Sequence, residues 1–493
     1  MSNLAVLPIL IPLLSGIIAA LMNRKQRAVR VFSTIMMLVN LGVTAYIGWY
    51  VFQNGPVILE TGGWKAPYGI ILVGDMLAIL LVITTNIIGL ACVFFAPKSL
   101  SEKQESFYFY TFFFMLISGV SGAFLTGDLF NLFVFFEVLL MASYGLITLG
   151  GEKVQFRESI KYVLINLFSS ILFVTVVSFL YSVVGTVNMA QIADRVQDVE
   201  QKGILTTIGI LLFFVFATKA AVFPLYYWLP KSYVVPNPVV SALFGALLTK
   251  VGIYSILRMF TIIFVHEVDL THQLFLWLAA LTMVFGVVGA LSTNNIKLIV
   301  TYNIIPAVGF MLMGIGIFTE VSIAGTVYYL IHDMVVKGAL FLLVGAIAYL
   351  AGTSDLRKMH GLIHHYPVIG WLFFIACITL AGIPPFSGFI GKILLLKGGL
   401  AQDQIFIVII GLITSLLILF SMIRIFIQGF WGEKDESFQP DKPKARAFAW
   451  PIGFLVFFSV FLGVGAEFVY PIVDEISNTL LDPSIYIESV LKE

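Results

Sequence analysis

The sequence contains few charged residues and almost no cysteine. Only 11% of its 493 residues are charged, 60% are hydrophobic, and the mean hydropathy is +1.02. Soluble domains carry about 25% charged residues, so this composition excludes a water-soluble fold. The two cysteines, Cys92 and Cys377, stand alone inside apolar runs. They exclude a disulfide framework, a cysteine zinc site and a thioredoxin-type redox pair.

Motifs of enzymes and nucleic-acid binders are also missing. The sequence has no Gly-rich phosphate loop, nucleophile elbow or paired-histidine haem pattern. The net charge is +1 and the basic residues are spread over short segments, which argues against a nucleic-acid partner. His360, His364 and His365 have a spacing that metal sites use, but a solvated basic loop explains them better. We therefore expect no metal site, no cofactor and no enzymatic activity.

Long apolar runs recur along the whole chain. About 20 apolar residues cross a bilayer as a helix, and the runs show no period-two alternation of barrel strands. At Gly127-Asp128, where two predicted helices meet, a single bent helix is the alternative. We predict an all-α polytopic membrane protein with 14 transmembrane helices, near residues 4–22, 31–52, 71–95, 108–126, 128–149, 161–184, 204–230, 237–263, 273–292, 298–318, 322–350, 368–398, 405–430 and 448–472.

The basic residues predict an orientation. One set of alternate loops holds 17 of the 28 Lys and Arg residues, whereas the other set holds only Lys65, Arg195, Lys202 and Lys492. Loops rich in Lys and Arg stay in the cytoplasm. The chain is therefore expected in a bacterial inner membrane with both termini outside.

Proline interrupts two predicted helices near mid-membrane. Pro224 follows Lys219 in helix 7, and Pro384 and Pro385 precede Lys392 in helix 12. Proline removes a backbone donor and breaks helices. The breaks lie 160 residues apart, at matching places in two five-helix blocks, 108–263 and 273–430.

An odd number of helices in each block inverts the second block, and inverted repeats with broken helices point to a transport path. Residues 1–107 then form a three-helix segment, and 431–493 form a cytoplasmic loop, a last helix and a periplasmic tail. The alternative is that proline is simply common in membrane helices.

Ionisable side chains lie deep within the predicted helices, where each costs about 2.5–3.5 kcal/mol to insert. Glu137 lies about 15 Å into helix 5, and we predict an ion pair with Lys219. A fixed packing pair is the alternative. Lys250 has no acid in its own helix, so we predict an unpaired lysine that exchanges its proton. Lys392 is expected to play a comparable part, unless it snorkels to the interface.

His332 and Lys337 lie in helix 11. Five residues turn a helix by about 500°, so the two side chains cannot share one face. His332 is expected to bridge lysines through water, although a packing histidine is nearly as good an explanation. Asp333 is expected to partner His332 or Lys337. Arg258, Arg424 and Lys397 lie near helix ends and are expected to anchor rather than conduct.

Three runs of the sequence resemble a known family. They are residues 128–145 (DLFNLFVFFEVLLMASYG), 219–224 (KAAVFP) and 381–392 (AGIPPFSGFIGK). They are similar to the antiporter-like membrane subunits of Mrp-type (Mnh, Sha) sodium/proton antiporters, particularly those of the D type, and of respiratory complex I.

The resemblance implies 14 helices, two inverted five-helix units and a proton path along a hydrated midplane axis. It implies an ion pair of Glu137 with Lys219, a central relay at Lys250, a terminal lysine at Lys392, and a helix 11 polar position at His332 and Lys337. It also implies partner subunits. Some relatives carry glutamate at the position of Lys392, which leaves the direction of coupling open.

We therefore expect a proton-translocating subunit of a multisubunit Na⁺/H⁺ antiporter that supports Na⁺ export and pH homeostasis. The alternative is a proton-pumping membrane-arm subunit of complex I or a related membrane-bound hydrogenase. A membrane enzyme would cluster its polar groups at one interface, whereas here they lie at mid-depth. A scaffold whose lysines only form pairs or bind lipid is the remaining alternative.

Overall fold

The computed structural model describes residues 2–66, 68–434 and 439–491. Lys492 and residues 435–438 of the predicted final part lie outside these residues. In the described part, 12 helices are long and apolar enough to cross a membrane, and Phe109–Leu125 and Pro367–Ala381 are shorter apolar helices. The structure is therefore an all-α polytopic membrane protein, as predicted, with about 12 candidate spans.

The apolar helices follow one another along the chain, several of them divided into two parts. They are α1 (Leu7–Leu21), α2 (Gln26–Asn54), α3 (Met76–Ser99), α5 (Phe109–Leu125), α6 (Leu129–Ile147), α7 (Lys153–Val184), α9 (Lys202–Ala220) with α10 (Leu229–Val234), α11 (Pro238–Leu243) with α12 (Thr249–Ile262), α13 (Val268–Leu291), α14 (Ile296–Tyr302) with α15 (Ile304–Ile317), α16 (Glu320–Leu350), α18 (Pro367–Ala381) with α19 (Ser387–Ala401), α20 (Ile405–Ile425) and α21 (Lys442–Val464).

The remaining elements connect these helices or follow the last of them. They are the strands β1 (Val57–Glu60) and β2 (Ile71–Gly74) and the helices α4 (Glu102–Ser106), α8 (Met189–Arg195), α17 (Leu362–His365), α22 (Ala466–Leu481) and α23 (Pro483–Val490).

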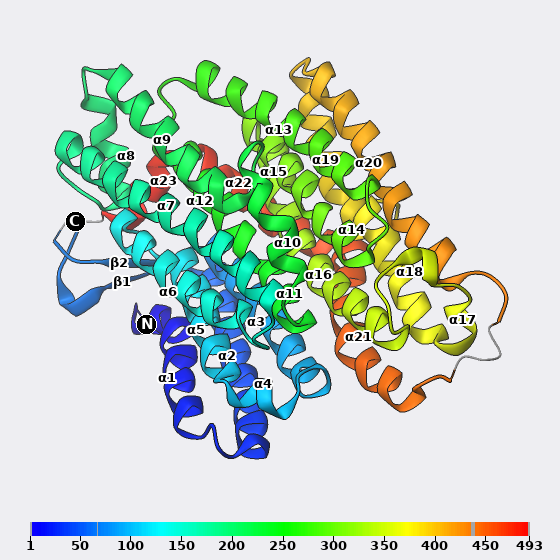
Figure 1. Cartoon of the computed structure of the whole chain (residues 1–493). Helices are drawn as coiled ribbons and strands as arrows, with labels where there is room; N and C mark the ends of the chain where they lie inside the picture. The colour runs from blue at the N-terminus through cyan, green and yellow to red at the C-terminus, as the bar shows by residue number, and fades with distance from the viewer. Residues whose placement is uncertain (1, 67, 435–438, 492–493) are drawn as a thin grey trace.

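The most buried helices form the centre of the bundle. The most apolar window of α16 and that of 238–262 are completely buried by protein, whereas those of α7 and α21 are only 39% buried. Figure 1 shows α1 and α2 at one end of the bundle and α18 and α20 at the other. The outward face of α7 carries Leu164, Phe168 and Ile171, each at least 57% exposed. Such an apolar outer surface suits contact with lipid.

The short turn at Gly127-Asp128 separates two helices. Helix α5 ends at Leu125, and α6 begins at Leu129 behind Asp128, whose side chain caps it by accepting from the backbone N–H of Asn131 at 2.7 Å. An N-cap of this kind starts a new helix. The alternative of one bent helix is therefore wrong.

Two parts of the structure were not predicted. Strands β1 and β2 pair antiparallel in the loop before α3, where Val, Ile and Leu residues favour strands. The predicted last helix, 448–472, is present as α21, but it ends at Val464, and the separate helix α22, which was not predicted, begins at Ala466. Gly465, between them, weakens a continuous helix.

The same backbone arrangement occurs twice in the fold. Asp128 forms an isolated antiparallel bridge with Asn188, and Asn295 forms one with Asp355. Each of the four residues also donates its backbone N–H to the hydroxyl of a threonine two positions earlier, at 3.1 to 3.2 Å. Both bridges join segments 60 residues apart. A Thr-x-Asp/Asn motif therefore marks matching points of two halves of the chain.

Candidate functional site

Asp333, on α16, lies at the centre of a cluster of buried charges. Its Oδ2 lies 2.7 Å from Lys250 Nζ and its Oδ1 lies 3.7 Å from Lys337 Nζ, and all three side chains are 0% exposed. Charges taken out of water are costly unless they are paired. The cluster holds two amines for one carboxylate, so it can carry one proton more than neutrality requires.

The prediction that Lys250 is unpaired is wrong. The sequence shows no acid in its own helix, but the fold brings α16 against it and supplies Asp333. Asp333 pairs with Lys250 and, more distantly, with Lys337. Lys250 and Asp333 lie 83 positions apart on different helices. Their ion pair therefore cannot be predicted from residue spacing within one helix. The expected pairing of Asp333 with Lys337 is confirmed, but its closer contact with Lys250 was not predicted.

A π-helical turn, Phe244–Leu248, positions Lys250. Its Nζ also donates to the carbonyl of Gly245 at 2.8 Å. A Cβ at Gly245 would lie 2.2 Å from the ring of Phe341 on α16, so only glycine allows this close approach. Single π-turns within helices are frequent at functional sites. This turn was not predicted from the sequence.

Lys337 lies against a helix break that was also missed. Its Nζ donates to the carbonyl of Asn303 at 2.9 Å, between α14 and α15. Pro306 lies four residues after Tyr302 and therefore cannot donate to the Tyr302 carbonyl. This proline was the available sequence signal.

His332 faces a different neighbour from Lys337, as the helical rotation predicted. Its Nδ1 lies 2.7 Å from the hydroxyl of Ser387, the first residue of α19, and the ring is completely buried. Its Nε2 has no hydrogen-bond partner among the described residues. The charges of Asp333, Lys337 and Lys392 all act on this ring. His332 therefore lies between the central cluster and the second helix break.

Lys392 donates hydrogen bonds to the backbone carbonyls at the second helix break. Helix α18 ends at Ala381, and Nζ of Lys392 donates to the carbonyls of Leu380 at 3.2 Å and Ala381 at 2.8 Å. In an unbroken helix those carbonyls would accept from residues 384 and 385, which are both proline and lack an N–H. Lys392 is only 4% exposed, so the snorkelling alternative is wrong. Its amine replaces the two missing backbone donors.

Lys219 lies at the first break, which is also present. Helix α9 ends at Ala220, and Ala221 has the left-handed φ of 63° just before Pro224. Nζ of Lys219 donates to the hydroxyl of Ser170 on α7 at 3.3 Å and lies 5.0 Å from the ring centroid of Phe136. The side chain is buried.

The predicted close ion pair of Glu137 with Lys219 is not formed. The Glu137 charge still acts on the lysine, but no oxygen of Glu137 lies within 4.0 Å of it among the described residues. Phe136 occupies the position facing Lys219, and the next residue points about 100° away around the helix. Oε1 of Glu137 is buried and has no hydrogen-bond partner in the described part of the chain.

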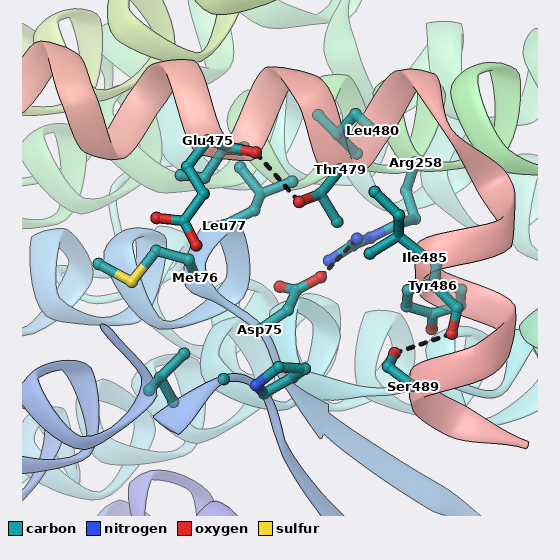
Figure 2. Close-up of a pocket in the computed structure, with 14 residues that line it drawn as sticks. Asp75, Met76, Leu77, Arg258, Glu475, Thr479, Leu480, Ile485, Tyr486 and Ser489 are labelled. Carbon is teal, nitrogen blue, oxygen red and sulfur yellow. Dashed lines mark hydrogen bonds and ion pairs between the residues drawn. The ribbon is translucent and has the colours of Figure 1, made fainter. Parts of the chain in front are cut away.

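Arg258 anchors one end of the Lys250 helix, as expected. Its guanidinium lies 2.6 Å from the Asp75 carboxylate at the start of α3, and 5.3 Å from the ring centroid of Tyr486 on α23. This pair lines a cavity of about 150 Å³. Glu475 of α22 also lines it, and Figure 2 shows these side chains together. The pair ties the β2–α3 turn and the C-terminal helices to α12.

The other charged residues noted in the sequence lie apart from this cluster. Arg424 donates to the carbonyl of Leu291 at 3.4 Å, and Lys397 is exposed near the end of α19. His364 lies 3.1 Å from the carbonyl of Gly432. Among the described residues, no group of three His, Cys, Asp or Glu side chains is placed to hold a metal ion.

Comparisons with known proteins identify the family of the chain. A family model described as NADH:quinone oxidoreductase/Mrp antiporter, TM, matches residues 126–418. The chain is 51% identical over 493 residues to the Na(+)/H(+) antiporter D subunit of Bacillus subtilis (strain 168), and the match covers 100% of both chains. It is 49% identical over 493 residues, with the same coverage, to the Na(+)/H(+) antiporter D subunit of Alkalihalophilus pseudofirmus.

A solved structure has the same fold. The chain superposes on one chain of the Mrp complex from Dietzia sp. DQ12-45-1b with a TM-score of 0.92, 28% sequence identity and 99% coverage of each chain. These findings confirm the resemblance carried by the three sequence runs. The chain belongs to the membrane-subunit family shared by NADH:quinone oxidoreductases and Mrp antiporters.

Proposed function

We propose that this chain is the proton-translocating subunit of a multisubunit Na⁺/H⁺ antiporter in the bacterial cell membrane. The names of the relatives support a secondary transporter rather than an enzyme, and they favour an antiporter over complex I or a hydrogenase. The observation that carries the mechanism is the fully buried Asp333, shared by Lys250 and Lys337. A structural ion pair needs only one of these amines.

The cluster provides a site for one exchangeable proton. When one lysine releases a proton, its neutral amine remains beside a lysine–aspartate pair whose charges cancel. The two oxygens of Asp333 face different amines, so the negative charge follows whichever lysine is protonated. Neither protonation state leaves an uncompensated carboxylate in the apolar interior, which is the costly arrangement.

His332 connects the cluster to Lys392. A neutral imidazole donates from one nitrogen and accepts at the other, so it passes a proton without a change of net charge. Ser387 lies at Nδ1 and Nε2 is left for water. On the other side, Lys219 and Glu137 extend the row of ionisable groups beyond Lys250. Protons move through water along Lys219, Lys250, Lys337, His332 and Lys392, and each charge that crosses the membrane yields about 2.3 kcal/mol per 100 mV.

The topology follows the same proposal. We assign 14 transmembrane helices, counting the two shorter apolar helices, in a segment 1–107, inverted five-helix repeats 108–263 and 273–430 with broken helices 7 and 12, and a final part 431–493. The repeated bridges Asp128 with Asn188 and Asn295 with Asp355 support the repeat, since they lie 167 residues apart. The Lys and Arg count of 17 to 4 supports both termini being outside.

The partners are the other subunits of the antiporter, because the relatives are named as subunits and the matching structure is a complex. The transported ions are H⁺ and, through the whole complex, Na⁺.

Asp333→Asn and Lys250→Met test the proposal. Asp333→Asn leaves the two buried amines without their carboxylate, and Lys250→Met removes a proton site. Exchange should fall at least about tenfold in each, which corresponds to about 1.4 kcal/mol. The measurement is Na⁺-dependent proton exchange in inside-out vesicles that contain the assembled complex. Asp355→Asn keeps a helix cap at a partly exposed position and is the matched control. Normal exchange in an assembled Asp333→Asn complex would leave the scaffold alternative standing.

A further inference from the structure

Two neighbouring cavities lie between the Lys250 helix and the surface. The larger, about 350 Å³, is lined by residues that include Ser99, Asn237 and Thr353. The smaller, about 10 Å³, is lined by residues that include Tyr233 and Phe341. A cavity of about 10–15 Å³ is sufficient for one water molecule. Lys297, Pro238 and Gly345 line both cavities, so a single layer of residues separates them.

The smaller cavity is lined by Tyr233, a residue whose hydroxyl needs a partner. Tyr233 is completely buried, and its Oη has no hydrogen-bond partner among the described residues. An unsatisfied buried polar group costs about 1–3 kcal/mol. One water molecule in the cavity would remove this cost. The site therefore suits water rather than an apolar filling.

The inner wall of the smaller cavity lies directly beside the central cluster. Phe341 lines the cavity, and its ring is packed so closely on Gly245 that a Cβ there would lie 2.2 Å from it. The carbonyl of Gly245 accepts from Lys250. Phe341 also follows Lys337 by four residues, so the two share one face of α16. The Phe341 ring therefore contacts both the cavity and the residue whose carbonyl binds the Lys250 amine.

We propose that these cavities form the aqueous access route to Lys250, with Lys297 as a proton relay between them and Phe341 as the gate. The larger cavity is bordered by Thr353 and Ser354, in a loop expected in the cytoplasm. The amine of Lys297 takes a proton from water in the larger cavity and releases one to water in the smaller. Movement of the Phe341 ring then admits water to Lys250. This inference rests on the proposed function and adds the side from which the cluster is reached.

Thiol labelling tests the outer part of the route. Cys92 and Cys377 are buried and are replaced by serine. Ala348 lines the larger cavity, so Ala348→Cys should react with a membrane-impermeant methanethiosulfonate from the cytoplasmic face only, and the reaction should block Na⁺-dependent exchange. Ala346→Cys, completely buried on the same helix, is the control and should not react. An unreactive Ala348→Cys, or one whose labelling leaves exchange unchanged, would overturn the route.

Substitutions at Lys297 separate a relay from a fixed charge. Lys297→Arg keeps the charge but cannot release its proton, whereas Lys297→His keeps a titratable base. A relay predicts exchange reduced at least fivefold in Lys297→Gln and Lys297→Arg and substantially retained in Lys297→His. Full activity of Lys297→Arg with loss in Lys297→Gln would assign only a structural charge. Normal activity of Lys297→Gln would remove Lys297 from the route.

Phe341→Ala tests the gate. It should increase proton leak in the absence of Na⁺ severalfold, while Leu342→Ala, equally buried on the next position, should not. Equal leak in both variants would overturn the gate. Failure of the route and of the proposed function are distinguishable. If Lys250→Met abolishes exchange but Ala348→Cys labelling has no effect, only the route fails; if Lys250→Met exchanges normally, the proton path itself fails.

Discussion

Lys219 and Lys392 each lie beside a proline break, but their amines have different hydrogen-bond partners. Lys219 donates to the hydroxyl of Ser170, whereas Lys392 donates to two backbone carbonyls left without partners by Pro384 and Pro385. A hydroxyl can donate or accept, so it serves both the charged and the neutral amine. Carbonyls only accept. The Ser170 hydroxyl can therefore serve either state of the Lys219 amine, whereas the Lys392 amine supplies donors that two buried carbonyls require.

The largest expected effect is that of Lys392→Met. It removes a proton site and leaves the carbonyls of Leu380 and Ala381 buried without a donor, at about 1–3 kcal/mol each. We expect loss of exchange and a thermal unfolding temperature lowered by several degrees. Lys397→Met, exposed on the same helix, is the control. An unfolding temperature equal to that of the control would show that the carbonyls do not depend on Lys392.

Lys219→Met should separate activity from stability. Exchange should again be lost, but the unfolding temperature should stay close to that of the unsubstituted complex, because only one hydrogen bond of 3.3 Å is removed. Vesicle exchange and thermal unfolding of the same preparations provide the comparison. A loss of stability as large as that of Lys392→Met would remove the distinction between the two breaks.

Ser170→Ala should have a smaller effect. It removes a hydrogen bond worth about 1 kcal/mol, so exchange should fall about fivefold while the complex assembles normally. Ser169→Ala is the matched control, since its hydroxyl donates instead to the carbonyl of Val215. Equal rates in the two variants would show that Lys219 does not use the Ser170 hydroxyl.

The smallest effect is expected at Asp128, in the turn before α6. Burial raises the pKa of this carboxyl to about 6 from an ordinary 3.8. A raised acid pKa stabilises the fold relative to the unfolded chain at low pH, and this contribution is lost as the pH rises through 6. Asp128→Asn keeps a capping side chain and should gain about 1 kcal/mol at pH 8 but nothing at pH 4. A gain of the same size at both pH values would contradict the assignment.

The sequence was sufficient for features that single residues control. Apolar runs predicted the helices, and proline predicted both breaks together with the lysines beside them. Pro306 and the repeated Thr-x-Asp/Asn motif are local sequence signals of the same kind. These signals are local or periodic. They are easy to interpret in membrane helices, because the backbone N–H and C=O groups there must form their hydrogen bonds within the protein.

Contacts between distant helices could not be predicted in this way. The pairing of Lys250 with Asp333 depends on how α12 packs against α16, and the separation of Glu137 from Lys219 depends on which face of α6 turns inward. Helix depth gives the level of a side chain in the membrane but not its direction. The sequence therefore identified most of the ionisable groups, and the fold determined their partners.

A structure of the intact complex in which ordered water is visible would test the proposed proton path most directly. The path predicts water at Nε2 of His332 and at Oε1 of Glu137, which have no hydrogen-bond partner among the described residues, and a continuous series of water molecules from Lys250 to Lys392. Fixed protein groups capping both atoms, with a dry apolar gap between the lysines, would contradict proton movement along this row.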